Sequence, residues 1–150
     1  MAVFRLIESC PLLDINSSYC NFLQCSHFAN TSVVAEMNGA LVGFISGYAI
    51  PERPDTLFVW QVAVAEKARG LGLASRMLTH ILARAHCIDI AYLETTITEN
   101  NHASWALFKS LAKAQSAGFQ SSGWMDKDTH FFGLHDSEAL VRIGPFNSHS

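Results

Sequence analysis

The sequence predicts an α/β fold, and two stretches carry that prediction. Between residues 57 and 117, a strand-like run, a glycine turn, a helix-like run, a second strand-like run and a second helix-like run follow one another. Strands that alternate with helices in this way favour a sheet with helices packed on it. Earlier in the chain, Asn38-Gly39 separates two β-rich runs, which is the strongest short-range signal for an antiparallel hairpin.

The first third of the chain is predicted to contain two helices followed by this hairpin. Apolar residues at helical spacing indicate helices over 3–9 and 16–30, with a break at Leu12-Leu13-Asp14 and Asn16 as the N-cap. Residues that favour β-structure predict the hairpin strands over 31–36 and 40–50. The PERPD segment at 51–55 then predicts a loop.

The rest of the chain is predicted to alternate between strands and helices. An apolar run over 57–64 indicates a largely buried strand that leads into the glycine turn. Amphipathic spacing predicts helices over 72–86 and 101–117. Short β-rich runs predict further strands over 91–98, 130–134 and 139–143.

Composition is typical of a globular protein with one domain. The 150 residues suffice for a single domain, predicted to span 1–150, but are too few for two ordinary ones. A net charge of -3 with 15% charged residues gives no basic face for nucleic acid. The N-terminus lacks a secretory apolar core, and no apolar run approaches the roughly 20 residues of a membrane span. We therefore expect a cytoplasmic protein that is not membrane-bound.

The cysteines and histidines are not spaced as metal ligands. Cys10, Cys20, Cys25 and Cys87 show no CxxC spacing, so buried reduced thiols are expected rather than a zinc site or disulfides. The seven histidines are scattered singly along the chain. The sequence therefore predicts no metal site.

The turn Arg69-Gly70-Leu71-Gly72 has the features of an anion-binding loop. A helix that begins near Gly72 leaves its first N–H groups without intrahelical partners and carries positive partial charge at that end. Glycine lacks the Cβ that would keep a diphosphate away, and Arg69 adds a cation. A Walker loop and a dinucleotide fingerprint fit poorly, because Leu73-Ala74 follow Gly72 and no glycine stands near Ser75. The motif alone leaves a second interpretation open, in which the glycines only relieve crowding.

Two motifs together resemble those of the Gcn5-related N-acetyltransferase superfamily. Residues 69–74, RGLGLA, are similar to its Q/R-x-x-G-x-G/A signature, and Asn101-x-x-Ser104-x-x-Leu107-Phe108 is similar to a block on its following helix. The resemblance implies a mixed central sheet flanked by helices, with acetyl-coenzyme A (acetyl-CoA) as cosubstrate. It also implies the residues that hold the coenzyme, which are Val62, Ala63, Val64, Arg69, Gly70, Leu71, Gly72, Leu73, Ala74, Asn101, Ser104 and Phe108.

Longer stretches resemble one family in that superfamily, the L-2,4-diaminobutyrate acetyltransferases of ectoine synthesis. The stretches are CPLLDINSSY (10–19), HFANTSVVAE (27–36), PERPDTLFVWQVAV (51–64), YLETTIT (92–98) and RIGPF (142–146). The resemblance implies acetylation of the γ-amine of diaminobutyrate. It also implies an acceptor site made by Asp14, Tyr19, Trp60, His135 and Glu138.

Each of these acceptor residues has a chemical rationale. Carboxylates pair with ammonium groups, and Trp60 offers a flat wall beside one of them. Because a protonated amine is unreactive, the site must also remove a proton. We expect Glu138 to be the base, directly or through water, with His135 second and Asp14 pairing with an ammonium. The residues alone leave structural roles open: a turn for Asp14, the core for Trp60 and a solvated loop for His135 and Glu138.

Two features depart from the family pattern. Family members usually have a strand ahead of the opening helix, whereas this chain begins at that helix. This difference leaves open how the sheet edge is formed and whether two copies form a homodimer. Phe108 stands where many superfamily members have a tyrosine assigned to protonating the leaving thiolate, and a phenyl ring cannot donate a proton. A transferase for another diamine or amino acid, and a non-catalytic acyl-CoA-binding module, stay open as alternatives.

Overall fold

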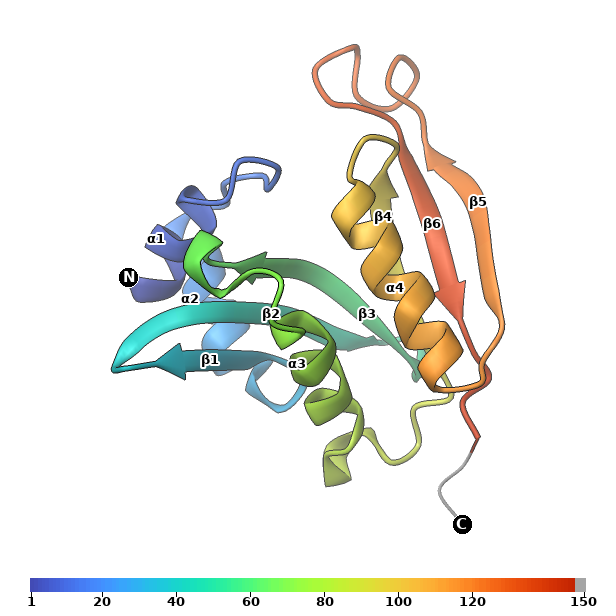
Figure 1. The fold of residues 1–150 in the computed structure, drawn as a ribbon. Helices are drawn as coiled ribbons and strands as arrows, with labels where there is room; N and C mark the ends of the chain where they lie inside the picture. The colour runs from blue at the N-terminus through green and yellow to red at the C-terminus, as the bar shows by residue number, and fades with distance from the viewer. Residues whose placement is uncertain (148–150) are drawn as a thin grey trace.

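The computed structural model describes residues 1–147 and contains a six-stranded mixed sheet with helices on both faces (Figure 1). The strand order is β1-β2-β3-β4-β6-β5, and among the strands of the described residues only β3 and β4 pair in parallel. The strands are β1 (Val33–Met37), β2 (Ala40–Ile50), β3 (Arg53–Val64), β4 (Tyr92–Thr98), β5 (Phe119–Met125) and β6 (Glu138–Ile143). The predicted α/β fold with a mixed sheet is confirmed.

The α-helices cover the two faces of the sheet. They are α1 (Ala2–Glu8), α2 (Ser18–Ser26), α3 (Leu73–Leu82) and α4 (His102–Ala114), with 3₁₀ turns at 29–31, 66–68 and 85–87. Successive strand residues point to opposite faces. Ile45 of β2 therefore packs in the core under α3 and α4, whereas its neighbour Phe44 packs with Leu6 and Ile7 of α1. Within residues 1–147, no helix is long and apolar enough to cross a membrane.

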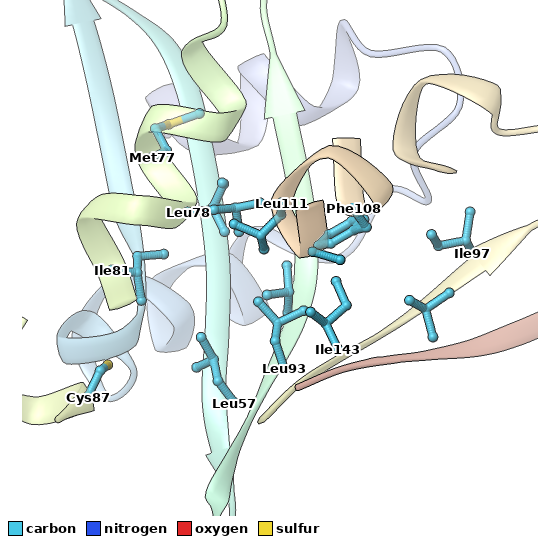
Figure 2. Packing of buried hydrophobic residues seen from close by; sticks show 14 residues of the cluster. Leu57, Met77, Leu78, Ile81, Cys87, Leu93, Ile97, Phe108, Leu111 and Ile143 are labelled. Carbon is cyan, nitrogen blue, oxygen red and sulfur yellow. The ribbon is translucent and has the colours of Figure 1, made fainter. Parts of the chain in front are cut away.

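The main core lies between the sheet and helices α3 and α4 (Figure 2). Leu78 and Ile81 of α3 are fully buried there, and Phe108 of α4 is 1% exposed. Burying one side chain of this size contributes about 1.5–3 kcal/mol. Because both helices are held by their buried faces, their N-terminal ends have fixed positions relative to β3 and β4.

Strands β3 and β4 pair at their beginnings and then diverge (Figure 1). The parallel register runs from Thr56↔Tyr92 to Val59↔Thr95, and β3 then continues along β2 alone. Where the two strands part, the Thr95 hydroxyl donates to the Val59 carbonyl at 3.0 Å. Trp60 is the extra residue of a β-bulge at the same place, because the register of β3 against β2 shifts there. The sheet is therefore open beside residues 60–64, just before the glycine turn.

Glu94 joins three strands through ionic hydrogen bonds. Its carboxylate accepts two bonds from Arg53 of β3 and one from Arg142 of β6, each at 2.8 Å. The Arg142 guanidinium also lies 3.8 Å from the centre of the Tyr92 ring. Glu94 is 3% exposed, and the hydrogen bonds from Arg53 and Arg142 lower the pKa of its carboxyl. This network links β3, β4 and β6 at the end of the sheet where β3 and β4 are paired.

The predicted hairpin is confirmed, but other boundaries differ. Asn38 and Gly39 have φ values of 53° and 77°, as a two-residue hairpin turn requires. The strand predicted over 130–134 is wrong, because those residues form turns. The missing strand is β5, which was not predicted because the QSSG centre of its sequence FQSSGWM lacks apolar residues and most of the strand is exposed at the sheet edge.

Smaller corrections concern the ends of elements and one thiol. The loop predicted at 51–55 is only a short turn, because Arg53 already pairs with Ile50. The helix predicted over 72–86 ends at Leu82. The helix predicted over 16–30 spans only 18–26, and Ser17 rather than Asn16 caps it. Cys10 and Cys87 are buried free thiols as expected and Cys20 is half-buried, whereas Cys25 is exposed.

Candidate active site

A cavity of about 390 Å³ lies between the end of β3, the glycine turn and the start of α4, and we call it the turn cavity. Most of the residues expected to hold the coenzyme line it: Val62, Val64, Arg69, Gly70, Gly72, Leu73, Ala74, Asn101 and Ser104. Three others are placed elsewhere. Ala63 is 1% exposed on the face of β3 that packs against α1, Phe108 is 1% exposed in the main core, and Leu71 is 61% exposed.

The turn cavity also has walls that were not among the residues expected to hold the coenzyme. Residues 10–13, from the loop between α1 and α2, cover one side of it. Ala103 and Leu107 of α4 line it as well. Leu107 belongs to the Asn101 motif, and its spacing of three from Ser104 places both on one helix face. No local signal in the sequence brings the α1–α2 loop to this cavity.

The glycine turn presents the start of α3 to the turn cavity. Gly70 and Gly72 have φ values of 75° and 71°, in the left-handed region that favours glycine. A Cβ at either position would meet no atom within 4 Å, so the space beside the turn is free for a ligand. The first hydrogen bond of α3 runs from Arg76 N–H to the Gly72 carbonyl, and no side chain caps the helix. Free N–H groups and the helix dipole therefore make this end suitable for phosphate.

A second cavity of about 290 Å³ adjoins the turn cavity, since Pro11 and Leu12 line both. We call it the loop cavity, because the α1–α2 loop and the β5–β6 loop supply most of its wall. Asp14 lines it from the first loop and His135 from the second. These two loops are far apart in the sequence and meet only in the folded protein.

Asp14, His135 and Glu138 form a cluster at this meeting point. His135 Nε2 lies 2.9 Å from Asp14 Oδ2 and 3.7 Å from Glu138 Oε1. Glu138 is the first residue of β6, so its backbone is fixed by pairing with Thr98 of β4. The predicted association of these three acceptor residues therefore has a geometric basis, because one imidazole nitrogen faces both carboxylates.

The hydrogen bonds of His135 favour its protonated form. Nδ1 lies 2.7 Å from the Asp136 carbonyl, and Nε2 lies 2.9 Å from the Asp14 carboxylate. Both partners only accept hydrogen bonds, and only the imidazolium donates from both nitrogens. The bond to Asp136, the bond and charge of Asp14, and the charge of Glu138 accordingly raise the pKa of His135.

The same three side chains could also surround a cation. They offer one ligand atom each, and these atoms lie within 4.8 Å of one another. The scattered histidines did not indicate such a grouping, because His135 meets its carboxylate neighbours only after folding. Two carboxylates attract a divalent cation as well as an ammonium group. Both nitrogens of His135 already face hydrogen-bond acceptors, so neither is directed at a metal ion.

Trp60 and Tyr19, two of the predicted acceptor residues, line neither of these cavities and are partly and largely exposed. Trp60 is 42% exposed and meets the Tyr48 ring edge-on, with 6.3 Å between the ring centres. Tyr19, on α2, is 69% exposed. The next residue after Trp60, Gln61, is buried and donates from Nε2 to the Asp14 carbonyl at 3.0 Å. Gln61 was not predicted as a site residue, and it ties the Asp14 loop to β3.

Comparisons with known proteins point to one group. Residues 2–112 match the model of the acetyltransferase (GNAT) family. The chain is 60% identical over 146 residues to the L-2,4-diaminobutyric acid acetyltransferase of Methylotuvimicrobium alcaliphilum, a match that covers 97% of this chain and 85% of that protein. It is 40% identical over 146 residues to the protein of the same name from Halalkalibacterium halodurans, covering 97% and 77%.

The structure is likewise similar to a solved protein of this group. The diaminobutyrate acetyltransferase EctA from Paenibacillus lautus, in complex with its substrate L-2,4-diaminobutyric acid and coenzyme A, superposes with a TM-score of 0.93 at 38% identity. The match covers 99% of this chain and 91% of that one.

Proposed function

We propose that this chain, which belongs to the acetyltransferase (GNAT) family, transfers the acetyl group of acetyl-CoA to the γ-amine of L-2,4-diaminobutyrate, a step of ectoine synthesis. One structural observation carries the proposal. The turn cavity, with its uncapped helix end, adjoins the loop cavity, which is lined by Asp14 and His135. A donor that carries a diphosphate and an acceptor that carries ammonium groups fit two such neighbouring cavities.

The residues of the turn cavity fit the coenzyme. The N–H groups at the start of α3 and the cation of Arg69 suit its pyrophosphate. The backbone of Val62 and Val64, on the part of β3 that has left β4, suits the pantetheine arm. A backbone N–H of this strand segment would also stabilise negative charge on the thioester oxygen during attack. Acetyl-CoA supplies the activated acetyl group.

The acceptor cluster supplies charge pairing and proton removal. Asp14 pairs with one ammonium group of the acceptor, while Trp60 and Tyr19 provide aromatic surface near it. Glu138 takes a proton from the γ-ammonium, directly or through water, because the neutral amine costs on the order of 4 kcal/mol to form at pH 7. The neutral nitrogen then bonds to the acetyl carbon while the carbon–sulfur bond breaks and the coenzyme A thiolate leaves. The further proton that the nitrogen loses on becoming an amide passes to that thiolate or to water. His135, 3.7 Å from Glu138, is the second candidate for the base, at a pH where it has lost its own proton.

Mass spectrometry tests this reaction directly. The pure protein is incubated with acetyl-CoA and diaminobutyrate, and fragmentation distinguishes the γ-acetyl from the α-acetyl product. Ornithine and lysine serve as competing acceptors, and Asp14→Asn serves as the variant with a weakened acceptor site. Formation of γ-N-acetyldiaminobutyrate is the expected result. Absence of any acetylated product would favour a non-catalytic acyl-CoA-binding module, and a preference for ornithine or lysine would favour another acetyltransferase.

Three broader features belong to the same proposal. Residues 1–150 act as a single N-acetyltransferase domain, the protein works in the cytoplasm, and two copies form a homodimer. Exposed apolar side chains of the α1–α2 region, such as Leu12, Ile15 and Phe22, support an association between copies. Sedimentation of the pure protein distinguishes a monomer from a dimer.

A further inference from the structure

The loop cavity carries charges of both signs. Asp14 lines it from the α1–α2 loop, and Lys127 lines it from the β5–β6 loop. Among the described residues of its wall, Lys127 is the one lysine or arginine. Thr98 and Asn100, at the end of β4, add neutral polar groups. Such a wall suits a ligand that itself carries both charges.

The backbone of Lys127 is held from both sides. Its N–H donates to the Ser137 hydroxyl at 2.8 Å, and its carbonyl accepts from the Gly133 N–H at 2.9 Å. Both bonds cross the β5–β6 loop and link its two arms. Lys127 is therefore positioned in the wall of the loop cavity by local hydrogen bonds rather than by strand pairing.

The side chain of Lys127, in contrast, is only loosely engaged. Its Nζ lies 3.7 Å from Asp136 Oδ1, beyond the usual N–H···O range of about 2.7–3.2 Å. The two side chains are 49% and 61% exposed, and exposed pairs of this kind stabilise little. The positive charge of Lys127 is thus available to an anion that enters the cavity.

We propose that Lys127 binds the α-carboxylate of the acceptor while Asp14 binds an ammonium group, so that the site selects diamino acids over plain diamines. This inference rests on the proposed function, because the acceptor there is an amino acid with a carboxylate to be recognised. A lysine–carboxylate bond is charge-assisted and stronger than a neutral one. Lys127 is accordingly a specificity-determining residue and takes no part in proton transfer.

The test compares two acceptors that differ by the carboxylate alone, diaminobutyrate and 1,3-diaminopropane. Steady-state kinetics are measured for the wild type, Lys127→Gln and Lys127→Arg. Lys109→Gln is the matched control, because Lys109 lies on α4 over the Trp105 ring, 5.8 Å from its centre. Thermal melts of all variants report whether the β5–β6 loop substitution disturbs the fold.

The expected result is selective. Lys127→Gln raises the KM for diaminobutyrate by roughly tenfold or more and leaves kcat and the KM for 1,3-diaminopropane nearly unchanged. Lys127→Arg restores most of the affinity for diaminobutyrate. Equal effects on both acceptors, or none, would overturn the inference while leaving the proposed reaction in place. A wild-type protein that acetylates neither acceptor would overturn the proposed function, and the inference with it.

Discussion

His135 and Asp14 are 121 residues apart in the sequence, yet His135 Nε2 lies 2.9 Å from Asp14 Oδ2. This contact joins the loop after α1 to the loop before β6, and both residues line the loop cavity. The carboxylate that holds the imidazole is also the group proposed to hold an ammonium of the acceptor. Protonated His135 and the acceptor therefore compete for Asp14.

The competition predicts how acceptor use depends on pH. The pKa of His135 is raised above its usual value near 6.5, so the imidazolium, which forms in acid, occupies Asp14 below the raised pKa. As pH rises through that value, the proton is lost, the positive charge that holds Asp14 disappears, and kcat/KM for diaminobutyrate increases. The stabilising effect of the ion pair on the fold is lost over the same interval, because a raised histidine pKa favours the folded state only at lower pH.

Profiles of kcat/KM against pH for the wild type and His135→Gln check this prediction. In His135→Gln the ionisation assigned to the histidine should disappear, while acetyl-CoA affinity stays constant. An unchanged profile in the variant would mean that another group, such as Glu138 or the substrate amine, controls the pH dependence.

Glu138→Gln is expected to lower kcat by about 10²-fold or more, because the amide keeps the shape of the side chain but accepts no proton. Acetyl-CoA affinity, measured by calorimetry, should not change. Glu36→Gln, on exposed β1, serves as the control for losing a carboxylate elsewhere. If kcat survives and only the acceptor KM rises, Glu138 is a binding residue and His135 or water is the base.

Gly72→Val is expected to weaken acetyl-CoA binding by about tenfold or more, because the branched side chain would fill the space beside the free N–H groups of α3. The left-handed backbone at Gly72 adds a folding cost of about 1–3 kcal/mol. Gly39→Val separates the two effects, since Gly39 has a similar φ of 77° and open surroundings but lies in the hairpin turn. Equal coenzyme affinity in both variants would argue against the anion-binding turn.

Phe108→Tyr is expected to give no catalytic gain. Phe108 is 1% exposed in the main core, so a new hydroxyl would be buried among apolar groups at a cost of about 1–3 kcal/mol in stability. A thiol ionises near pH 8.5, so the thiolate leaves adequately without a proton donor. Phe22→Tyr, on the exposed face of α2, is the stability control.

Rate profiles against pH decide the question for Phe108→Tyr. Turnover should rise through one dominant ionisation, with no new alkaline limb below about pH 9. A gain of roughly tenfold, about 1.4 kcal/mol of barrier, together with a new alkaline limb would show that proton donation limits the wild type.

Glu94→Gln is expected to lower the free energy of unfolding by about 1–3 kcal/mol, since it removes charge-assisted hydrogen bonds to Arg53 and Arg142. The lowered pKa of Glu94 means that its contribution is present above the carboxyl's unfolded-state pKa and is lost as pH falls through the folded-state value. Urea unfolding at a series of acidic pH values measures both effects. A variant that loses stability in acid as steeply as the wild type would contradict this assignment.

Local sequence signals sufficed for the hairpin, the glycine turn and the helices that follow it. The positive φ values at Asn38 and Gly39 and the helix start after Gly72 depend on residues adjacent in the chain, so short motifs predict them. Edge strand β5 was not predicted, because its sequence shows no alternation of apolar and polar residues and its pairing partner β6 lies beyond a loop.

The candidate site was identified by residue type and resemblance, but its geometry depends on tertiary structure. Nothing near Asp14 in the sequence indicates that His135 and Glu138 will meet it, or that Gln61 will hold its carbonyl. Lys127 likewise reaches the loop cavity only because hydrogen bonds across the β5–β6 loop place it there. Sequence alone therefore determined which chemical groups are present and the local turns and helices that carry many of them. The packing of α1, the sheet and α4 decided which groups face each other, because contacts between distant segments form only when their apolar faces are buried together.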